Sequence, residues 1–159
     1  MTEHSPLAGR VRTEESLART ASALVVGWLV PGAGHALLGR VGRGLLFFAL
    51  IMGSFGLGLA HDGRLALYNS RDAFLSGLQL VANVGVGPAD FLARLNVYGE
   101  AAYSLPDPSS PWYRRRVETF RDRQRSAVSA YGTAYLWSAG MMNLLLLMDV
   151  WDIAKRRKD

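Results

Sequence analysis

Four polar residues stand inside or beside uncharged stretches of this sequence, and their side chains could do chemistry: His35, Asn143, Asp149 and Asp152. Asp149 and Asp152 are three residues apart, so their carboxylates would share one face of a helix. Either carboxylate, together with the imidazole of His35, could hold a metal ion or transfer a proton. An ionisable group within an apolar segment is a candidate functional residue, because its burial there is costly. One histidine and two carboxylates match no recognised metal-ligand spacing, however, and both aspartates lie at the end of their apolar stretch.

Structural pairing is therefore the interpretation that we favour for these residues. Asp149 would form an ion pair with Arg40 or Arg43. Asp152 would pair with a cation one helical turn further along the chain. The amide of Asn143 would form a hydrogen bond with a neighbouring helix, as polar side chains in apolar helices commonly do.

Enzyme motifs are missing from this sequence. It contains no cysteine, which excludes disulfides, thiolate metal sites and cysteine nucleophiles. It also lacks a Ser/His/Asp order, a zinc-protease motif and a phosphate-binding loop. We therefore predict that the protein is not an enzyme, and we assign no catalytic, cofactor-binding or metal-binding residue.

The elements that must position the polar residues are long uncharged stretches. Residues 126–148 carry no charged side chain, and the basic cluster 155–158 follows them. About 20 apolar residues cross a hydrocarbon core of about 30 Å, and a Lys/Arg cluster holds the end of such a helix at the head groups. Three further windows are uncharged apart from His35, namely 20–39, 44–60 and 73–89. The predicted fold class is all-α, an integral membrane bundle of about four hydrophobic helices, three or four of them true spans, with an amphipathic surface helix.

A single membrane domain is expected over residues 1–159. Its predicted parts are a flexible N-terminus (1–13), a helical hairpin with a Pro-Gly break (14–60), a third hydrophobic helix (73–95), a loop (96–110), an amphipathic helix (111–125), the last span (126–154) and a basic tail (155–159). At the break, the first helix either resumes after a kink or leaves its Pro-Gly segment in a crevice. The sequence Gly-Val-Gly-Pro interrupts the third helix, which could span the membrane, re-enter it or lie at its interface.

The net charge of +5 suits a membrane surface. Arg114, Arg115 and Arg116 stand near aromatic residues, a composition that also suits nucleic acid, but acidic residues interrupt this basic stripe. Basic residues beside spans are attracted to anionic head groups, so we expect anionic lipids as partners and no nucleic acid. With four spans, nine of the 18 Lys and Arg residues fall on the inner side, so charge does not decide the orientation. We predict that the protein lies in a bacterial cytoplasmic membrane, with both termini on the inner side.

Small residues recur four apart in the second helix of the hairpin, at Ala49/Gly53, Ser54/Gly58 and Gly56/Ala60. Such pairs let helix backbones approach closely in lipid. They indicate a surface on which another helix packs.

The residues around the break form the clearest motif: Pro31, Gly32, Gly34, His35, Gly39, Arg40 and Arg43. This segment resembles the hairpin of the two-transmembrane-helix domain family, whose hallmark is Pro-Gly-x-Gly-His, a Leu-Gly pair and a Gly-rich start of a second apolar helix. Ala36 and Leu37 depart from the aromatic residues that often follow the histidine in that family. The glycines do not form a dinucleotide-binding loop, since no strand precedes them. With the two arginines they could instead hold a lipid phosphate at a helix N-terminus.

The C-terminal region is similar to an uncharacterised bacterial membrane family that joins this hairpin to a second signature, formed here by residues 131–133, 139–145 and 149–154. The resemblance implies a membrane location and brings no known activity with it.

Three functions remain open, and we expect the first: a structural or accessory subunit that packs against a membrane partner, a homo-oligomeric channel or transporter-like or lipid-binding protein, and a lipid-modifying enzyme. Polar residues that line one shared cavity would favour a channel. Polar residues paired separately, with the small-residue surface exposed, would favour assembly. An open pocket that brings His35 to a carboxylate would favour an enzyme.

Overall fold

The computed structural model describes residues 6–105 and 109–156, and these residues are mostly helical. Along the described chain the helices are α1 (Pro6–Leu29), α2 (Ala33–Leu37), α3 (Val41–Ala60), the 3-10 turn η1 (Ser70–Asp72), α4 (Ala73–Val84), α5 (Pro88–Tyr98), α6 (Pro111–Arg125) and α7 (Ser129–Arg156). Tyr68 and Ser104 form an isolated β-bridge, and the described ranges contain no strand. The all-α prediction is confirmed. Parts of the predicted N-terminus, loop and basic tail lie outside the described residues.

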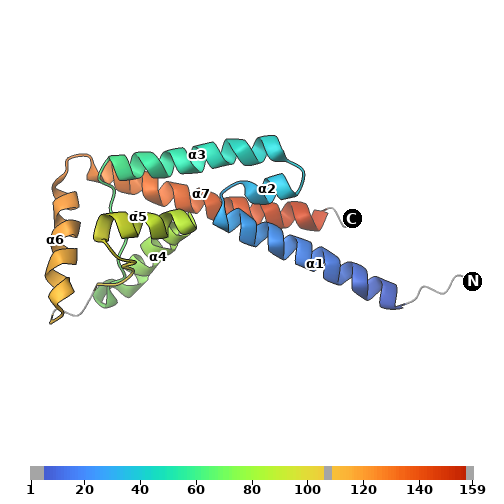
Figure 1. The fold of residues 1–159 in the computed structure, drawn as a ribbon, viewed down its shortest axis with the longest axis horizontal. Helices are drawn as coiled ribbons and strands as arrows, with labels where there is room; N and C mark the ends of the chain where they lie inside the picture. The colour runs from blue at the N-terminus through green and yellow to red at the C-terminus, as the bar shows by residue number, and fades with distance from the viewer. Residues whose placement is uncertain (1–5, 106–108, 157–159) are drawn as a thin grey trace, which may run out of the picture.

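Two long apolar helices, α3 and α7, run antiparallel and side by side along the molecule (Figure 1). Small residues let them approach closely, since a Cβ atom added to Gly58 would lie 2.7 Å from the side chain of Leu136. Ile51 and Phe55 of α3 are buried in the core that also contains Leu136 and Ala139 of α7. This pair of helices is the frame on which the shorter elements pack.

Only two helices of the described residues are long and apolar enough to cross a membrane, Val41–Ala60 and Ser129–Lys155. The prediction of about four hydrophobic helices, with three or four true spans, is therefore wrong in number. Uncharged windows mark apolar composition, but a span also needs an uninterrupted helix of about 20 residues. The apolar part of α1, Leu17–Leu29, is too short, and the stretch 73–95 is divided.

The Pro-Gly segment turns the chain at the end of α1 and packs on the start of α3. The first helix begins at Pro6, before the predicted start at residue 14, so the predicted flexible N-terminus is helical from that residue on. Gly32 has a φ of 83°, in the left-handed region that glycine adopts readily. A Cβ atom there would collide with the carbonyl oxygen of Gly44. Because Pro31 and Gly32 are both buried, the turn lies inside the protein, and a short helix, α2, resumes after it.

The single hydrophobic helix predicted over 73–95 is two helices, α4 and α5, joined by a buried turn. They have 12 and 11 residues, so each is about 17 Å long. Gly87, with a φ of 79°, and Pro88, at the first turn of α5, make the break. In Figure 1 both helices extend from the turn toward the same end of the molecule. The turn packs on the middle of α7, where a Cβ atom on Gly140 would collide with the carbonyl oxygen of Ala82.

The polar helix α6 occupies the range predicted for the surface helix and lies across the end of α3 and α7 (Figure 1). Its inner side contacts the extended segment that follows α3. The guanidinium carbon of Arg64 lies 5.8 Å from the ring centre of Phe120, and Arg123 donates a hydrogen bond to the carbonyl of Gly63 at 3.1 Å. α6 therefore covers this segment, 61–69, at one end of the fold.

Candidate functional site

His35 and Asp149, whose partners the sequence leaves open, meet in the structure. The Nε2 atom of His35 lies 2.7 Å from Oδ2 of Asp149. The His35 side chain is fully buried, with its ring 5.5 Å from that of Phe47, whereas the Asp149 side chain is 53% exposed. The predicted pairing of Asp149 with Arg40 or Arg43 is therefore wrong, because the imidazole binds the carboxylate instead.

Close backbone packing brings α2 to α7 at this point. A Cβ atom on Gly34 would lie 2.6 Å from the carbonyl oxygen of Ala23 and 3.0 Å from the side chain of Val150. Gly39, with a φ of 83°, closes the hairpin after α2. Gly34 and Gly39 thus each have a conformational or packing role, and they fix the position of His35.

The other predicted residues do not join this pair. Arg40, Arg43 and Asp152 are exposed. The side chain of the cation predicted to pair with Asp152, at position 156, lies outside the described residues. Asn143 is fully buried and donates a hydrogen bond from Nδ2 to the carbonyl of Gly85 at 2.9 Å. The predicted set therefore divides into the α2–α7 contact and a separate contact at the turn between α4 and α5.

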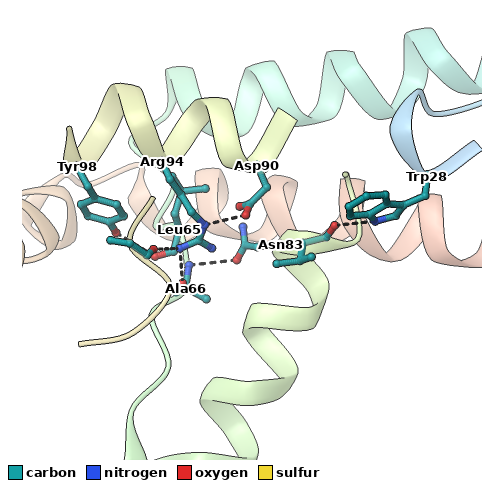
Figure 2. Close-up of polar contacts among 9 residues, drawn as sticks. Trp28, Leu65, Ala66, Asn83, Asp90, Arg94 and Tyr98 are labelled. Atoms are coloured by element: carbon teal, nitrogen blue, oxygen red, sulfur yellow. Dashed lines mark hydrogen bonds and ion pairs between the residues drawn. The ribbon is translucent and has the colours of Figure 1, made fainter. Parts of the chain in front are cut away.

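The turn between α4 and α5 also receives a side chain from α1. The indole Nε1 of Trp28 donates a hydrogen bond to the carbonyl of Val84 at 3.2 Å, as Figure 2 shows. A Cβ atom on Gly87 would collide with the carbonyl oxygen of Trp28. The carbonyls of Val84 and Gly85, at the end of α4, thus accept hydrogen bonds from side chains of α1 and α7, which joins three separate parts of the chain.

Asp90 and Arg94 on α5 form the most deeply buried ion pair of the described residues, and no sequence motif identified this pair as a candidate site (Figure 2). Their side chains are 1% and 0% exposed, and Nε of Arg94 donates to Oδ2 of Asp90 at 2.7 Å. Nη1 of Arg94 donates to the carbonyls of Ala66 and Ala102, at 2.9 and 2.6 Å. The guanidinium also lies 4.4 Å from the ring centre of Tyr103. One arginine therefore binds a carboxylate and two distant backbone segments.

Two further side chains hold the extended segment after α3. The N–H of Ala66 donates to Oδ1 of Asn83 at 3.2 Å, and the hydroxyl of Tyr98 donates to the carbonyl of Leu65 at 3.0 Å. Buried backbone groups outside helices and sheets need such partners. Burial raises the pKa of Tyr98 above its ordinary value of 10.0, which favours the protonated phenol that donates this hydrogen bond. The cluster is thus a scaffold for the segment 61–69.

Three atoms of this cluster have no hydrogen-bond partner: Nδ2 of Asn83, Oδ1 of Asp90 and Nη2 of Arg94. Two donors and one acceptor can bind a small polar group but not a cation, since two of the three carry hydrogen. In the described part of the chain no group of three His, Cys, Asp or Glu residues could hold a metal ion. Cavities of about 570, 440 and 280 Å³ are lined by residues other than His35.

The sequence carried a signal for the ion pair but none for the rest of the cluster. Asp90 and Arg94 stand four apart just after a helix start, which is the spacing of a helical ion pair. Asn83 and Tyr98 bind backbone atoms far away in the chain, which no local spacing indicates.

A family model matches residues 22–159, most of the chain, and describes a family of unknown function, DUF6677. The chain belongs to DUF6677. No curated protein and no solved structure shows a significant match to it. The DUF6677 match includes the Pro-Gly turn, the α4–α5 turn and α7, so the contacts of His35, Arg94 and Asn143 all lie within it.

Proposed function

We propose that this DUF6677 protein is an integral, multi-pass membrane protein in which α3 and α7 cross the bilayer, and that it is an accessory subunit that packs against a partner in the membrane. The observation that carries the membrane assignment is the exposure of its most apolar helices. Their apolar windows have mean hydropathies of 1.7 and 1.2, yet only 22% and 39% of each window is buried. A core helix of a soluble protein with this hydropathy would be mostly buried, because apolar surface left in water is unfavourable.

The short helices would then form two hairpins that enter the bilayer from opposite faces. The α4–α5 hairpin extends from its turn toward the α6 end, and the α1–α2 turn opens toward the other end (Figure 1). Irregular backbone at membrane depth must find its hydrogen bonds within the protein. Asn143 and Trp28 supply such bonds at the tip of the α4–α5 hairpin. This geometry supports re-entry for residues 73–95, one of the three alternatives for that stretch.

The proposal of an accessory role rests on the outward surface of α3. Ala49, Gly53, Gly56 and Ala60 are all exposed, and at helical spacing they share one face, which we call the small-residue face. A Cβ atom added to Gly53 or Gly56 would meet nothing within 4 Å, whereas Gly58, on the opposite face, is packed against α7. Small residues let a second helix approach closely in lipid. This free face supports docking of a partner helix.

The polar residues give less support to a channel or an enzyme. His35 binds Asp149, Asn143 binds Gly85, and Arg94 binds Asp90, each at a different place. A pore needs polar groups along one shared path. A hydrolase needs an acid or base that a substrate can reach, and His35 is fully buried.

Single cysteines test the membrane assignment, because the natural chain has none. We expect the protein to stay in the membrane after an alkaline carbonate wash. A membrane-impermeant maleimide should label Arg114→Cys and Arg43→Cys in membrane vesicles of opposite orientation, and should leave Leu50→Cys unlabelled in both. Release by carbonate, or labelling of Leu50→Cys as fast as Arg114→Cys, would contradict the assignment.

The accessory role is tested on the particle purified at native expression level in a mild detergent. A second protein in stoichiometric amount is expected, and Gly53→Leu with Gly56→Leu should remove it. Gly77→Leu is the matched control, since a Cβ atom at Gly77 on α4 also meets nothing within 4 Å. A disulfide dimer formed by Gly53→Cys, with no second protein present, would replace the accessory role with a homo-oligomer.

A further inference from the structure

Three buried polar atoms without a hydrogen-bond partner belong to the hairpin of α4 and α5. Among the described residues, seven buried side-chain nitrogen and oxygen atoms lack a partner, and these three are Nδ2 of Asn83, Oδ1 of Asp90 and Nη2 of Arg94. The three residues are 0%, 1% and 0% exposed, so bulk water does not reach them. Because a buried polar atom without a partner is costly, three of them in one hairpin indicate a bound polar group.

The three side chains converge on one place between α4 and α5. Nη1 of Arg94 donates to the carbonyl of Ala66, and Oδ1 of Asn83 accepts from the N–H of the same residue, at 2.9 and 3.2 Å. In Figure 2 the side chain of Asn83 points from α4 toward the guanidinium of Arg94 and the carboxylate of Asp90. The Ala66 N–H also fixes which way the Asn83 amide is turned, so the atom directed at the ion pair is the donor Nδ2.

The ion pair itself leaves the other two atoms side by side. In a guanidinium group, the Nε–H and one Nη2–H point in the same direction and form a fork that fits both oxygens of a carboxylate. Nε of Arg94 donates to Oδ2 of Asp90 at 2.7 Å, whereas Nη2 and Oδ1, the second half of this fork, do not bind each other. The fork is therefore open at the place that Asn83 faces.

We propose that Asn83, Asp90 and Arg94 bind one buried water molecule. It accepts hydrogen bonds from Nδ2 of Asn83 and Nη2 of Arg94, and it donates one to Oδ1 of Asp90. Two donors and one acceptor match the capacity of water, which accepts two hydrogen bonds, and buried waters typically form about three. The water joins α4 to α5 and, through Ala66, to the segment 61–69. This role does not depend on whether α3 and α7 cross a membrane.

The same three atoms disfavour other ligands. A cation would face two N–H donors, and an anion would face a carboxylate oxygen that carries negative charge. None of the three residues lines the cavities of about 570, 440 and 280 Å³, which disfavours a larger organic ligand. A water molecule is neutral and small, and it can donate and accept at once.

A crystal structure of the full chain, at a resolution that shows ordered solvent, tests the site directly. A single solvent peak is expected within about 2.7–3.2 Å of all three atoms. A direct hydrogen bond to Oδ1 of Asp90 from Nη2 of Arg94 or from Nδ2 of Asn83, with no solvent peak between them, would overturn the proposal.

Rotating-frame NOE spectra in detergent test the site in solution, because cross-relaxation with a bound water and proton exchange with solvent give signals of opposite sign. The side-chain amide protons of Asn83 should show cross-relaxation with water. The indole N–H of Trp28 is the control and should show none, since it donates directly to the carbonyl of Val84. Equal signals at Asn83 and Trp28 would overturn the proposal.

Asp90→Asn tests the hydrogen-bond pattern with little change of shape. Its amide oxygen can still accept from Nε of Arg94, and its amide nitrogen then replaces Oδ1. A water molecule that already accepts two hydrogen bonds cannot accept a third, so the water signal at Asn83 should be lost. An unchanged signal in this variant would overturn the proposal, and the comparison of Asn83 with Trp28 in the natural protein still tests it if the variant does not fold.

Discussion

The side-chain amide of Asn143 donates a hydrogen bond to the carbonyl oxygen of Gly85 at 2.9 Å, which ties the middle of α7 to the break between α4 and α5. Both partners are buried, and the glycine is packed so closely that a Cβ atom would lie 2.7 Å from the carbonyl oxygen of Gly140. A helix interrupted inside the protein leaves backbone carbonyls without partners, and a donor on the facing helix supplies one. The contact thus holds the turn between α4 and α5 against α7.

Replacing Asn143 with leucine should therefore destabilise the protein. Asn143→Leu keeps the size of the side chain but leaves the carbonyl of Gly85 buried without its donor, which costs about 1–3 kcal/mol. The free energy of unfolding in detergent measures the effect. Asn96→Leu is the control, since Asn96 is exposed on α5. Equal stability of the two variants would show that the hydrogen bond does not hold the hairpin.

Replacing the buried Arg94 should lower the free energy of unfolding more than replacing Asn143 does. A second substitution at Asp90 should reverse this loss only in part. Arg94→Met leaves Asp90 as an unpaired buried charge, which costs about 3–5 kcal/mol. Adding Asp90→Leu should recover only part of this loss, because Arg94 also donates to the carbonyls of Ala66 and Ala102. Unfolding free energies of the single and double variants give the coupling.

A matched surface pair provides the control for Arg94. Arg125 and Asp122 lie 3.4 Å apart, with side chains 80% and 69% exposed. Arg125→Gln should change the unfolding free energy by less than about 1 kcal/mol, since exposed pairs contribute little. Full recovery in the double variant at Asp90 and Arg94 would mean that the two backbone hydrogen bonds add nothing.

The sequence predicted the helical class and the breaks because these depend on local chemistry. Pro31 and Gly32 end α1, Gly87 and Pro88 divide α4 from α5, and Pro111 starts α6. The number of long apolar helices was overestimated, since an uncharged window does not reveal whether one helix continues through it. Residues 73–89 are uncharged, yet two glycines and a proline divide them.

Pairings between distant segments could not be predicted from spacing. The sequence offered Asp149 the partners His35, Arg40 and Arg43, and only the close approach of Gly34 to Val150 brings the histidine to it. The role of Arg94 could not be predicted, because it donates hydrogen bonds to two backbone carbonyls that no sequence pattern indicates. Local signals fix where elements end, and three-dimensional packing decides which polar groups meet.

Loss of the carboxylate at position 149 should destabilise the contact between α2 and α7. Asp149→Ala removes the partner of the buried Nε2 of His35, whose Nδ1 atom already has no hydrogen-bond partner. A cost of about 1–3 kcal/mol is expected for a buried polar group left unpaired. Asp149→Asn should restore most of the stability, because its amide oxygen still accepts a hydrogen bond. Asp152→Ala, one turn further along, should have little effect, and a loss equal to that of Asp149→Ala would contradict the pairing.

Two glycines of the hairpin should respond in opposite directions to alanine. Gly32→Ala forces a φ of 83° on a residue with a Cβ atom, which would also collide with Gly44, so a clear loss of thermal stability is expected. Gly42→Ala lies in the first turn of α3 with nothing within 4 Å of the added atom. It should leave stability unchanged or raise it by up to about 1 kcal/mol, since alanine favours helix. Equal melting temperatures of the two variants would contradict the buried turn.

Alkaline pH should weaken the hold of Tyr98 on the segment after α3. Burial raises the pKa of Tyr98 in the folded protein above its ordinary value of 10.0. The unfolded chain therefore loses this proton first, so the stability that the phenol contributes is complete below pH 10 and is lost as the pH rises through the higher folded-state pKa. The difference in unfolding free energy between the natural protein and Tyr98→Phe should shrink above about pH 10. Tyr131→Phe, at a side chain that is 69% exposed, should follow the natural protein across the same range, and a constant difference for Tyr98→Phe would show that its hydroxyl is not a buried donor.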